Sequence, residues 1–341
     1  MRIVILGGCG FIGSNIAIFL KKNLIKTKII SIDNFFRKGS KINYKRLKDN
    51  NIKNLKKDIS IESSLKNLGK VDLFIDCCAD PAIENSKKNI NTVIKNNFLT
   101  TLNILNKTIE KKTPIIFLST SRVYSIKKIN NLIKRKNYKE TFNLKNKISE
   151  NFNTTDIKSI YGLTKLSSED LIKEYSYLFN IKYIINRCGV ISGPWQLGKQ
   201  EQGLFSFWMK NHILKSRIKY IGYGGYGNQV RDVLHIDDLC NLILLQINNL
   251  KRINNKTFNV GGGNKNKISL IKLTKICEKI THNKCKIEHI PQTSNYDIPY
   301  YVSDIKKVKK FYKWKPKKNV LRLMKDIYVW MKKYKINLKD F

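Results

Sequence analysis

The stretch "RIVILGGCGFIGSNIAIFL" (residues 2–20) decides the fold of this chain of 341 residues. Its first five residues are typical of a buried strand, and an amphipathic helical pattern follows the glycines Gly7, Gly10 and Gly13. A pyrophosphate that rests on a helix N-terminus needs backbone N–H groups within close reach, and side chains at these glycines would block it. The spacing therefore predicts a dinucleotide-binding turn, with a glycine-rich turn that binds nothing as the alternative.

An acidic residue, Asp33, ends the second predicted strand (28–33), twenty residues after Gly13. Its carboxylate suits the two adenosine ribose hydroxyls and would repel a 2′-phosphate, which favours NAD over NADP. Arg37 in "DNFFRKG" favours NADP instead, because an arginine there could bind a 2′-phosphate. With Asp33 in place, NAD is the expected cofactor.

Apolar runs alternate with amphipathic stretches through the first half of the chain, which predicts a parallel sheet covered by helices on both faces. The predicted strands are residues 2–6, 28–33, 53–59 (weaker), 71–79, 114–120 and 182–190. The fold class is thus a Rossmann-type doubly wound parallel sheet with a smaller, mixed α/β C-terminal substrate lobe. We expect a nucleotide-binding domain at 1–190 with a return segment at about 228–260, and the substrate lobe mainly at 191–341.

The chain is strongly basic, with a formal net charge of +41. Lysines are spread over the whole length among Asn and Ile, which favours a general compositional bias over a nucleic-acid or membrane surface. A non-catalytic dinucleotide- or RNA-binding protein of the same fold is the alternative from another class. We expect neither nucleic acid nor membrane as a partner.

The seven cysteines form no disulfide framework and, with the four histidines, no metal-ligand spacing. We therefore expect reduced thiols, a cytoplasmic location and no bound metal. The apolar run before the first glycines is too short for a signal peptide, and no run approaches the length of a membrane span.

A second motif lies in the middle of the chain, where "YGLTKLSSEDLI" begins a predicted helix at Tyr161. Tyr161 and Lys165 are four residues apart and share a helical face, so the lysine ammonium should lower the pKa of the tyrosine. Thr120, at the end of the strand 114–120, adds a hydroxyl. Together they suit removal of a proton from a substrate alcohol while its carbon is oxidised by a nicotinamide.

These motifs together resemble the extended short-chain dehydrogenases/reductases, specifically the nucleotide-sugar epimerase and dehydratase group, over nearly the whole chain. The resemblance implies that Thr120, Tyr161 and Lys165 are catalytic, and that Asn97 in "NNFLTTLNIL" corresponds to an asparagine that starts a helix. The cofactor-binding residues that it implies are Gly7, Gly10, Phe11, Ile12, Gly13, Asp33, Asn34, Arg37, Asp58, Ile59, Ala79, Asn97, Tyr161, Lys165 and Cys188.

Two later segments match the substrate side of the same group. "GNQVRDVLHIDDL" (227–239) contains Arg231, which the resemblance places on the substrate diphosphate. The segment after Gly193-Pro194 contributes sugar and phosphate contacts, while Trp195 and Trp208 are expected in packing. The expected substrate-binding residues are Ser121, Gln196, Lys199, Gln200, Gln202 and Arg231.

Within the group the chain resembles the CDP-paratose 2-epimerase (CDP-tyvelose epimerase) subfamily in "DNFFRKG", in the insertion at 125–155 and in "QVRDVLH". This implies NAD-dependent inversion at C2 of a CDP-sugar, with a 4-epimerase or a reductase of another nucleotide sugar as the alternative. It also implies a homodimer formed through helices near 97–112 and 161–180. The insertion is either a lid or a surface excursion.

Two departures from the group pattern affect the expected chemistry. Many relatives have an arginine in the late loop that reaches the nucleotide phosphates, and residues 291–299, "PQTSNYDIP", have none. The 4,6-dehydratases place Asp-Glu directly after the catalytic threonine, whereas Ser121 and Arg122 follow here. Without an acid to drive loss of water, a dehydratase is disfavoured.

Overall fold

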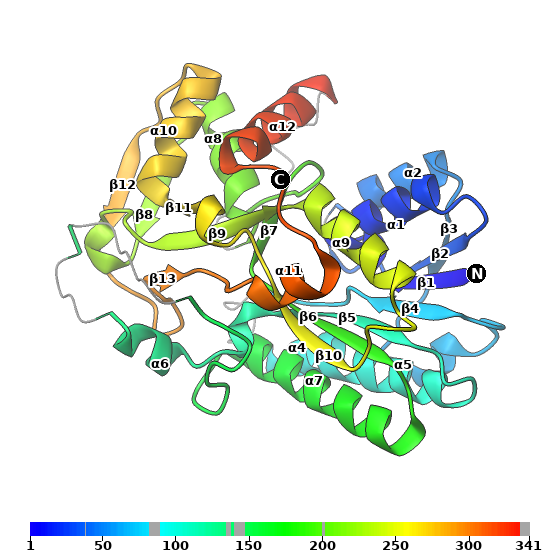
Figure 1. The fold of residues 1–341 in the computed structure, drawn as a ribbon. Coiled ribbons are helices and arrows are strands. Elements are labelled where there is room, and N and C mark those ends of the chain that lie inside the picture. The colour runs from blue at the N-terminus through cyan, green and yellow to red at the C-terminus, as the bar shows by residue number, and fades with distance from the viewer. Residues whose placement is uncertain (38, 82–88, 134–137, 140–146, 200–201, 335–341) are drawn as a thin grey trace. The chain divides into compact units, whose positions relative to one another are not determined.

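The computed structural model describes residues 1–37, 39–81, 89–133, 138–139, 147–199 and 202–334, which fall into two compact units (Figure 1). The first unit comprises Met1–Val123, Ser159–Cys188 and Cys240–Phe258, and the second comprises Tyr124–Lys158, Gly189–Leu239 and Asn259–Phe341. The unit boundary at Cys188 lies close to the boundary expected at 190. Residues 124–158 belong to the second unit rather than to the first, because Ile148 pairs through its backbone with Val302 and Asp304 near the C-terminus.

The first unit is built on a seven-stranded sheet with the order β10-β6-β5-β4-β1-β2-β3. Adjacent strands from β3 to β6 in this order run parallel to each other. Ile3 of β1 lies opposite Ile29 of β2 on one side and Leu73 of β4 on the other. This confirms the predicted fold class. The strands are β1 Arg2–Leu6, β2 Lys28–Asp33, β3 Lys53–Lys56, β4 Leu73–Asp76, β5 Ile115–Thr120, β6 Tyr183–Cys188 and β10 Lys256–Val260.

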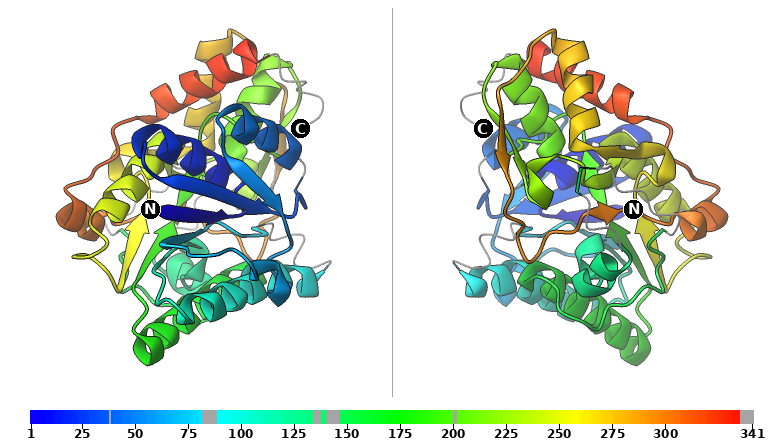
Figure 2. Two further views of the ribbon diagram at one scale, coloured as in Figure 1. Left: turned by 90° about the vertical axis from the view of Figure 1, so that its right-hand side faces the viewer. Right: turned by 90° about the vertical axis from the view of Figure 1, so that its left-hand side faces the viewer.

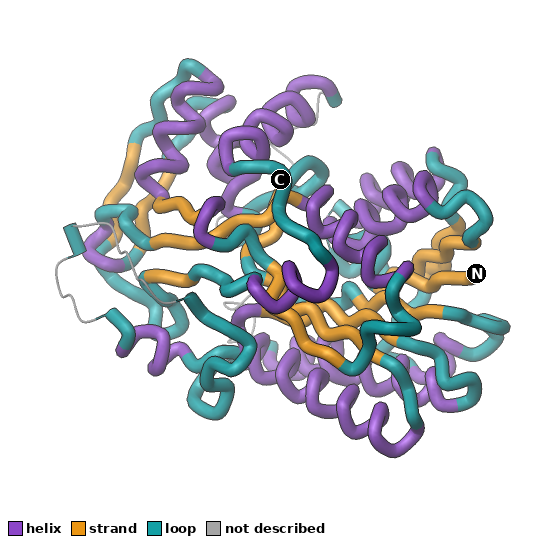
Figure 3. The backbone as a smooth tube through the Cα atoms, viewed as in Figure 1, coloured by secondary structure: helices purple, strands orange, loops and turns teal. Residues whose placement is uncertain are grey.

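Helices cover both faces of this sheet (Figures 1 and 2). Helices α1 and α2 lie on one face, and α4, α5 and α7 lie on the other, so the sheet is the middle of three layers (Figure 3). The helical segments are α1 Phe11–Asn23, α2 Ser40–Asp49, η1 Glu62–Leu65, α4 Ile90–Ile94, the π-turn η2 Lys95–Leu99, α5 Thr100–Ile109, η3 Ser121–Val123, α7 Ile160–Phe179 and α9 Ile236–Asn248, which begins in the second unit.

The central strands β1, β4 and β5 of this sheet are mostly apolar because both of their faces are buried. Val4, Phe74 and Phe117 have no exposed surface and belong to one cluster with residues of α5 and α7. Burying each such side chain contributes roughly 1.5–3 kcal/mol. The continuous apolar runs in the sequence thus reflect a sheet that is covered on both sides.

A buried ion pair attaches helix α7 to the sheet. The carboxylate of Glu169 in α7 forms an ion pair with Nη2 of Arg187 in β6 at 2.7 Å. It also accepts a hydrogen bond from the Ser119 hydroxyl of β5 at 2.5 Å. Glu169 is fully buried and the Arg187 side chain is only 7% exposed. Because Tyr161 lies in the first turn of α7, this pair helps to fix the position of that tyrosine relative to the ends of the strands.

We expect Glu169→Gln to lower the free energy of unfolding of the first unit by about 3 kcal/mol, because it removes the carboxylate charge that the buried Arg187 guanidinium contacts. Urea unfolding followed by far-UV circular dichroism measures this loss. The matched control is Asp170→Asn, which removes an exposed pair with Lys173 on the same helix and should change the value by less than about 0.5 kcal/mol. An equal effect of the two substitutions would contradict the role given to Glu169.

The second unit has two small sheets and its own core. Strand β9 is central to the larger sheet, where it pairs with β7, β11 and β13, and β8 pairs with β12. A cluster that includes Trp208, Met324 and Trp330 fills the space between the helices. The elements are α6 Ile126–Asn131, β7 Val190–Ser192, α8 Leu204–Ile213, β8 Ile218–Ile221, η4 Tyr223–Gly225, β9 Val230–His235, η5 Asn264–Asn266, β11 Lys267–Ser269, α10 Leu270–Thr281, β12 Ile287–Ile290, β13 Tyr300–Tyr301, α11 Lys306–Tyr312 and α12 Val320–Lys333.

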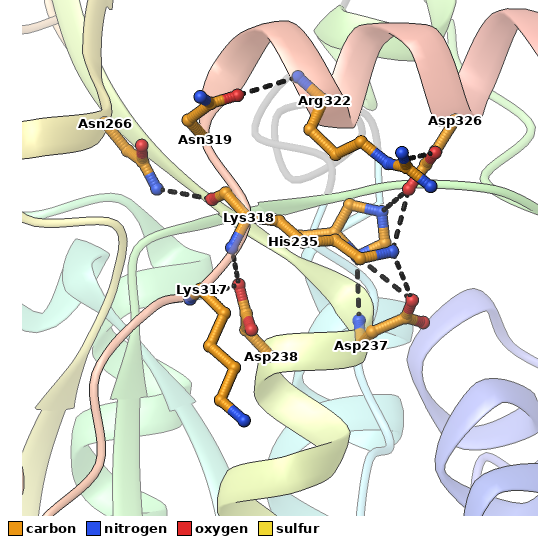
Figure 4. Close-up of polar contacts among 9 residues, drawn as sticks. All are labelled: His235, Asp237, Asp238, Asn266, Lys317, Lys318, Asn319, Arg322 and Asp326. Atoms are coloured by element: carbon orange, nitrogen blue, oxygen red, sulfur yellow. Dashed lines mark hydrogen bonds and ion pairs between the residues drawn. The ribbon is translucent and has the colours of Figure 1, made fainter.

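A polar network joins the end of β9 to helix α12 (Figure 4). The buried imidazole of His235 accepts the backbone N–H of Asp237 at Nδ1 (3.0 Å), and its Nε2 lies 3.4 Å from Asp326. Lys318 Nζ bridges the carboxylates of Asp237 and Asp326 at 2.7 Å each, and Arg322 pairs with Asp326. Burial lowers the pKa of His235 to about 4, so the imidazole is neutral, and its Nε2 makes no hydrogen bond to the described residues.

This lowered pKa predicts that the second unit loses stability in acid. His235 titrates near 6.5 when unfolded, so its contribution is complete above that pH and is lost as the pH falls toward 4. Between pH 7 and pH 5 the loss should be about 2 kcal/mol. All four tryptophans lie in the second unit, so urea unfolding followed by tryptophan fluorescence measures it. His235→Asn should flatten this dependence, and His282→Gln should keep it; equal slopes in wild type and His235→Asn would contradict the assignment.

Candidate active site

The glycine turn after β1 is packed so closely that side chains are excluded. Gly7 has φ +69°, and its N–H and that of Gly8 donate to the Ile32 carbonyl. A Cβ on Gly13 would lie 2.4 Å from the Gly7 carbonyl oxygen, and one on Gly8 would lie 2.0 Å from the Ser31 hydroxyl. The turn therefore brings the start of α1 directly against the end of β1.

The N-terminus of α1 has the properties of an anion site. Gly10 caps the helix without a side chain, and no acidic residue lies in the first turn. The backbone N–H groups of Phe11, Ile12 and Gly13 are therefore at the positive end of a helix dipole. This arrangement fits the pyrophosphate of a dinucleotide.

Asp33 joins the glycine turn to the loop after β2. Its carboxylate accepts the N–H of Cys9 (2.9 Å) and the N–H of Phe35 (2.8 Å), and burial raises its pKa. The remaining lone pairs of its two oxygens face the same pocket as Gly7 and Gly10. The side chain therefore holds the turn in place and retains acceptor capacity for ribose hydroxyls.

A pocket at the carboxyl ends of the strands brings together most of the residues expected to bind cofactor. Strand ends of this kind are where ligands bind in doubly wound sheets. Its lining residues are Gly7, Gly10, Asp33, Asn34, Phe36, Arg37, Lys57, Asp58, Ile59, Cys77, Cys78, Ala79, Asn96 and Thr100. The lining residues that were not expected from the sequence are Phe36, Lys57, Cys77, Cys78, Asn96 and Thr100.

Asn97 lies elsewhere than expected. It does not start a helix but sits in the π-turn η2, within a helix that begins at Ile90, and it is fully buried. Its side chain accepts the Asp80 N–H (2.6 Å) and donates to the Thr164 hydroxyl (3.1 Å). Asn97 thus connects the loop after β4 to helix α7, while its neighbours Asn96 and Thr100 line the pocket.

Thr120 and Tyr161 are brought together from β5 and α7. The Thr120 side chain is close enough to the Tyr161 hydroxyl to lower its pKa, and the Thr120 oxygen accepts the N–H of Arg122 (3.2 Å). The expectation that Lys165 lowers the pKa of Tyr161 is wrong for this structure. Burial raises that pKa to about 12, and the opposing influences are the Thr120 side chain and the positive charge of Arg122.

Lys165 is directed instead at the peptide group of Cys78. Its Nζ donates to the Cys78 carbonyl (3.2 Å) and lies 3.9 Å from the centroid of the Phe117 ring. Asp76 accepts the N–H of Cys78 at 2.9 Å. An acid and a base thus bind the backbone N–H and carbonyl of Cys78, which lines the pocket. Burial lowers the pKa of Lys165 and raises that of Asp76, and their mutual attraction opposes both shifts.

Asp76 was missed by the sequence analysis. The only signal was an acid within the apolar run "VDLFIDCCA", where most positions are hydrophobic. An acid that is fully buried in such a run needs a partner, and Lys165 and the Thr101 hydroxyl (3.2 Å) supply it.

Cys188 ends β6 and is buried, and burial raises its pKa to about 12, so its thiol is neutral. All seven cysteines are free thiols. In the part of the chain that the structure describes, no group of three His, Cys, Asp or Glu side chains is arranged to hold a metal ion. The described helices include none that is long and apolar enough to cross a membrane.

In the second unit, the segment after Gly193 is held mainly by its own contacts. Gln196 accepts the Ser192 hydroxyl (2.7 Å) and donates to the Ile191 carbonyl, so its amide anchors the loop. The backbones of Lys199 and Gln202 pair with each other, and Gln200 lies outside the described residues. The two tryptophans pack as expected: Trp208 is buried with its indole N–H on Thr274, and Trp195 contacts the rings of Trp330 and Tyr334.

Arg231 of β9 is paired within the late loop. Its guanidinium donates to the Asp297 carboxylate at 2.8 Å and to the Ile298 carbonyl at 2.5 Å. The loop that lacks the expected arginine therefore supplies an acid to Arg231. The side chain is 17% exposed, so part of its surface remains accessible to an anion.

Comparison with known proteins agrees with this geometry. Residues 3–261 match the model of the NAD dependent epimerase/dehydratase family. The chain belongs to this family. It is accordingly an NAD-dependent enzyme of the epimerase class, which confirms the expected cofactor and the resemblance drawn from the motifs. The Asp33 carboxylate and the glycine turn are the features of this structure that fit that cofactor.

Individual relatives within the family act on different nucleotide sugars. The CDP-paratose 2-epimerase of Salmonella typhi is 28% identical over 97% of this chain and 99% of its own length. The UDP-glucuronate 4-epimerase of Thermodesulfobacterium geofontis is 26% identical over 96% and 95%. A crystal structure of UDP-glucuronic acid 4-epimerase from Bacillus cereus with UDP-glucuronic acid and NAD superposes with a TM-score of 0.83 at 24% identity, covering 98% of this chain and 100% of that one.

Denaturing the purified protein should release NAD rather than NADP, because Asp33 would face a 2′-phosphate with its negative charge. Enzymatic assay of the supernatant distinguishes the two. Asp33→Asn should weaken NAD binding by about tenfold, since a neutral amide is a poorer acceptor than a carboxylate, and should narrow the difference between NAD and NADP. Tighter binding of NADP than of NAD by the wild-type protein would contradict this assignment.

Proposed function

We propose that this protein is an NAD-dependent nucleotide-sugar epimerase that inverts C2 of a CDP-linked dideoxyhexose, of the CDP-paratose to CDP-tyvelose type. The observation that carries the chemistry is the proximity of the Thr120 side chain, at the end of β5, to the Tyr161 hydroxyl of α7, with Lys165 on the same helix. The sugar is supported by the match with the CDP-paratose 2-epimerase along almost the full length of both chains. The second candidate is inversion at C4 of a UDP-sugar, the activity that the name of the UDP-glucuronate 4-epimerase relative states.

Bound NAD supplies the oxidising and reducing equivalents for a reversible alcohol–ketone conversion. The task of this chain's residues is to move one proton. Tyr161, as the phenolate, takes the proton of the substrate hydroxyl and returns it when the alcohol re-forms, while Thr120 holds that hydroxyl in line with the phenol oxygen. Inversion follows if the keto sugar turns its other face to the cofactor before reduction.

One positive side chain supports a phenolate that burial opposes. Arg122 lowers the pKa of Tyr161 in this structure. A bound, oxidised nicotinamide would add a positive charge to the site, whereas Lys165 donates to the Cys78 carbonyl. We propose that Lys165 also binds the nicotinamide ribose, since its Nζ lies at the Cys78 carbonyl on the pocket wall.

The residues that follow Thr120 favour epimerisation over loss of water. Elimination requires an acid to protonate the leaving hydroxyl, and at the positions next to Thr120 the chain has Ser121 and Arg122. We assign Ser121 to the substrate. Arg231 is assigned to the diphosphate, to which its guanidinium would turn from Asp297.

We also propose that the protein is a homodimer through the helices near 97–112 and 161–180. Apolar side chains are exposed on these helices, with Leu99 at 38% and Leu163 at 48%. Helix α7 packs beside α4 and α5 within the first unit, so a second copy would complete a four-helix arrangement. A monomer in light scattering at micromolar concentration would contradict this part of the proposal.

The decisive test uses CDP-paratose deuterated at C2 with the purified holoenzyme. The product CDP-tyvelose should retain the deuterium, because the proposed route never exchanges the C2 hydrogen with water. Mass spectrometry of the product in ordinary water measures the retention. Washout of the label would instead indicate deprotonation beside a carbonyl and would exclude this mechanism.

Tyr161→Phe provides the control for the catalytic role. It removes only the hydroxyl that is proposed to carry the proton, so turnover should fall by at least about a hundredfold while folding and NAD binding persist. Retention of more than a tenth of the wild-type rate would contradict the role of Tyr161. Turnover of a UDP-sugar but of no CDP-sugar would agree with the proposed chemistry and contradict the proposed substrate.

A further inference from the structure

An ion pair lies between two loops of the first unit that border the dinucleotide pocket. Arg37 Nη1 is 3.2 Å from Asp80 Oδ1. The Arg37 side chain is 38% exposed and lines the pocket, whereas the Asp80 side chain is only 3% exposed. The buried acid thus fixes the end of a half-exposed arginine.

The strand order places this pair across the glycine turn. Arg37 belongs to the loop after β2 and Asp80 to the loop after β4, and β1 lies between these two strands in the sheet. Neighbouring strands are about 4.8 Å apart, so β2 and β4 are separated by roughly 10 Å. A bond between the two loops therefore has to cross the carboxyl end of β1, where Gly7 and Gly10 lie.

Both ends of the pair are held by backbone contacts that do not involve the ion pair. On one side, Asp33 accepts the Phe35 N–H, and Phe35 adopts a left-handed conformation with φ +60°. On the other side, the Asp80 N–H donates to the buried Asn97 side chain at 2.6 Å. The loops are thus positioned independently, and the arginine side chain is the part that has to move for the connection to open.

We propose that the Arg37–Asp80 pair is a clasp that closes over the pyrophosphate region of the bound dinucleotide and slows its release. The proposal rests on NAD binding, which the family establishes, and not on the identity of the sugar. An epimerase that returns its cofactor to the starting oxidation state in each cycle has no need to exchange it. A clasp on the cofactor side suits that requirement, because substrate can then turn over while the dinucleotide stays bound.

The experiment measures the rate at which NAD leaves the purified holoenzyme after dilution, by rapid gel filtration and assay of the retained NAD. Asp80→Asn and Arg37→Gln should each raise this rate about fivefold or more, as for a partly buried charge pair. The double variant should be no faster than the faster single variant, since one interaction is lost in all three. Reversing the charges with Arg37→Asp and Asp80→Arg together should restore part of the retention.

Two controls separate the clasp from general effects of charge and folding. Lys219→Gln, which removes an exposed ion pair with Glu288 in the second unit, should leave the NAD release rate unchanged. Circular dichroism should show the same folded content in all variants, because the Asp80 backbone bond to Asn97 does not depend on the carboxylate. Raising the salt concentration should speed release from wild type more than from Asp80→Asn.

Three results would overturn the proposal: unchanged NAD release in both single variants, fully additive effects in the double variant, or unchanged NAD release with a gain in NADP affinity in Asp80→Asn. The last result would mean that Asp80 serves to keep Arg37 from a 2′-phosphate. None of these outcomes depends on epimerase activity. Loss of C2 inversion with normal NAD retention would instead contradict only the proposed function.

Discussion

The first unit depends on the close approach of helix α1 to the end of β1. The space between Gly13 and the Gly7 carbonyl is too small for a single methyl group, since a Cβ would come within 2.4 Å. This contact directs the N-terminus of α1 toward the pocket and leaves its first N–H groups available to an anion. Asp33 then fixes the turn from the second strand through the Cys9 N–H. The cofactor site is therefore a consequence of how tightly one helix can pack on one strand.

The region around Tyr161 contains several buried charged groups. Three of its buried charged groups also position other parts of the first unit. Asp76 accepts the Cys78 N–H, Lys165 donates to the Cys78 carbonyl, and Glu169 attaches α7 to β5 and β6. Such groups are unfavourable to bury alone and are stable here because each has a partner. The consequence is a rigid frame around Tyr161, whose own pKa is raised because the frame excludes water.

The second unit is organised differently, with its polar network on the side of helix α12. His235 is neutral and its neighbours Asp237, Lys318 and Asp326 satisfy one another, so the network ties β9 to the C-terminal helix without a buried net charge of its own (Figure 4). Arg231 lies on the same strand as His235 and is paired with Asp297 in the late loop. A single strand thus carries the structural histidine and the arginine that we assign to substrate.

The sequence by itself determined the fold class, the family and the residues at the strand ends. Continuous apolar runs and the glycine spacing follow from local rules, because a strand that is buried on both faces must be apolar and a turn this tight must lack side chains. The Thr120, Tyr161 and Lys165 set was readable for the same reason, since four residues make one helical turn. Only the tertiary structure decided what those groups contact. It directed Lys165 to Cys78 and Asp76 rather than to the tyrosine, placed Asn97 in a π-turn and paired Arg37 with Asp80. Those pairings join residues 17 to 89 positions apart, and their geometry depends on strand order and burial, which no local pattern specifies.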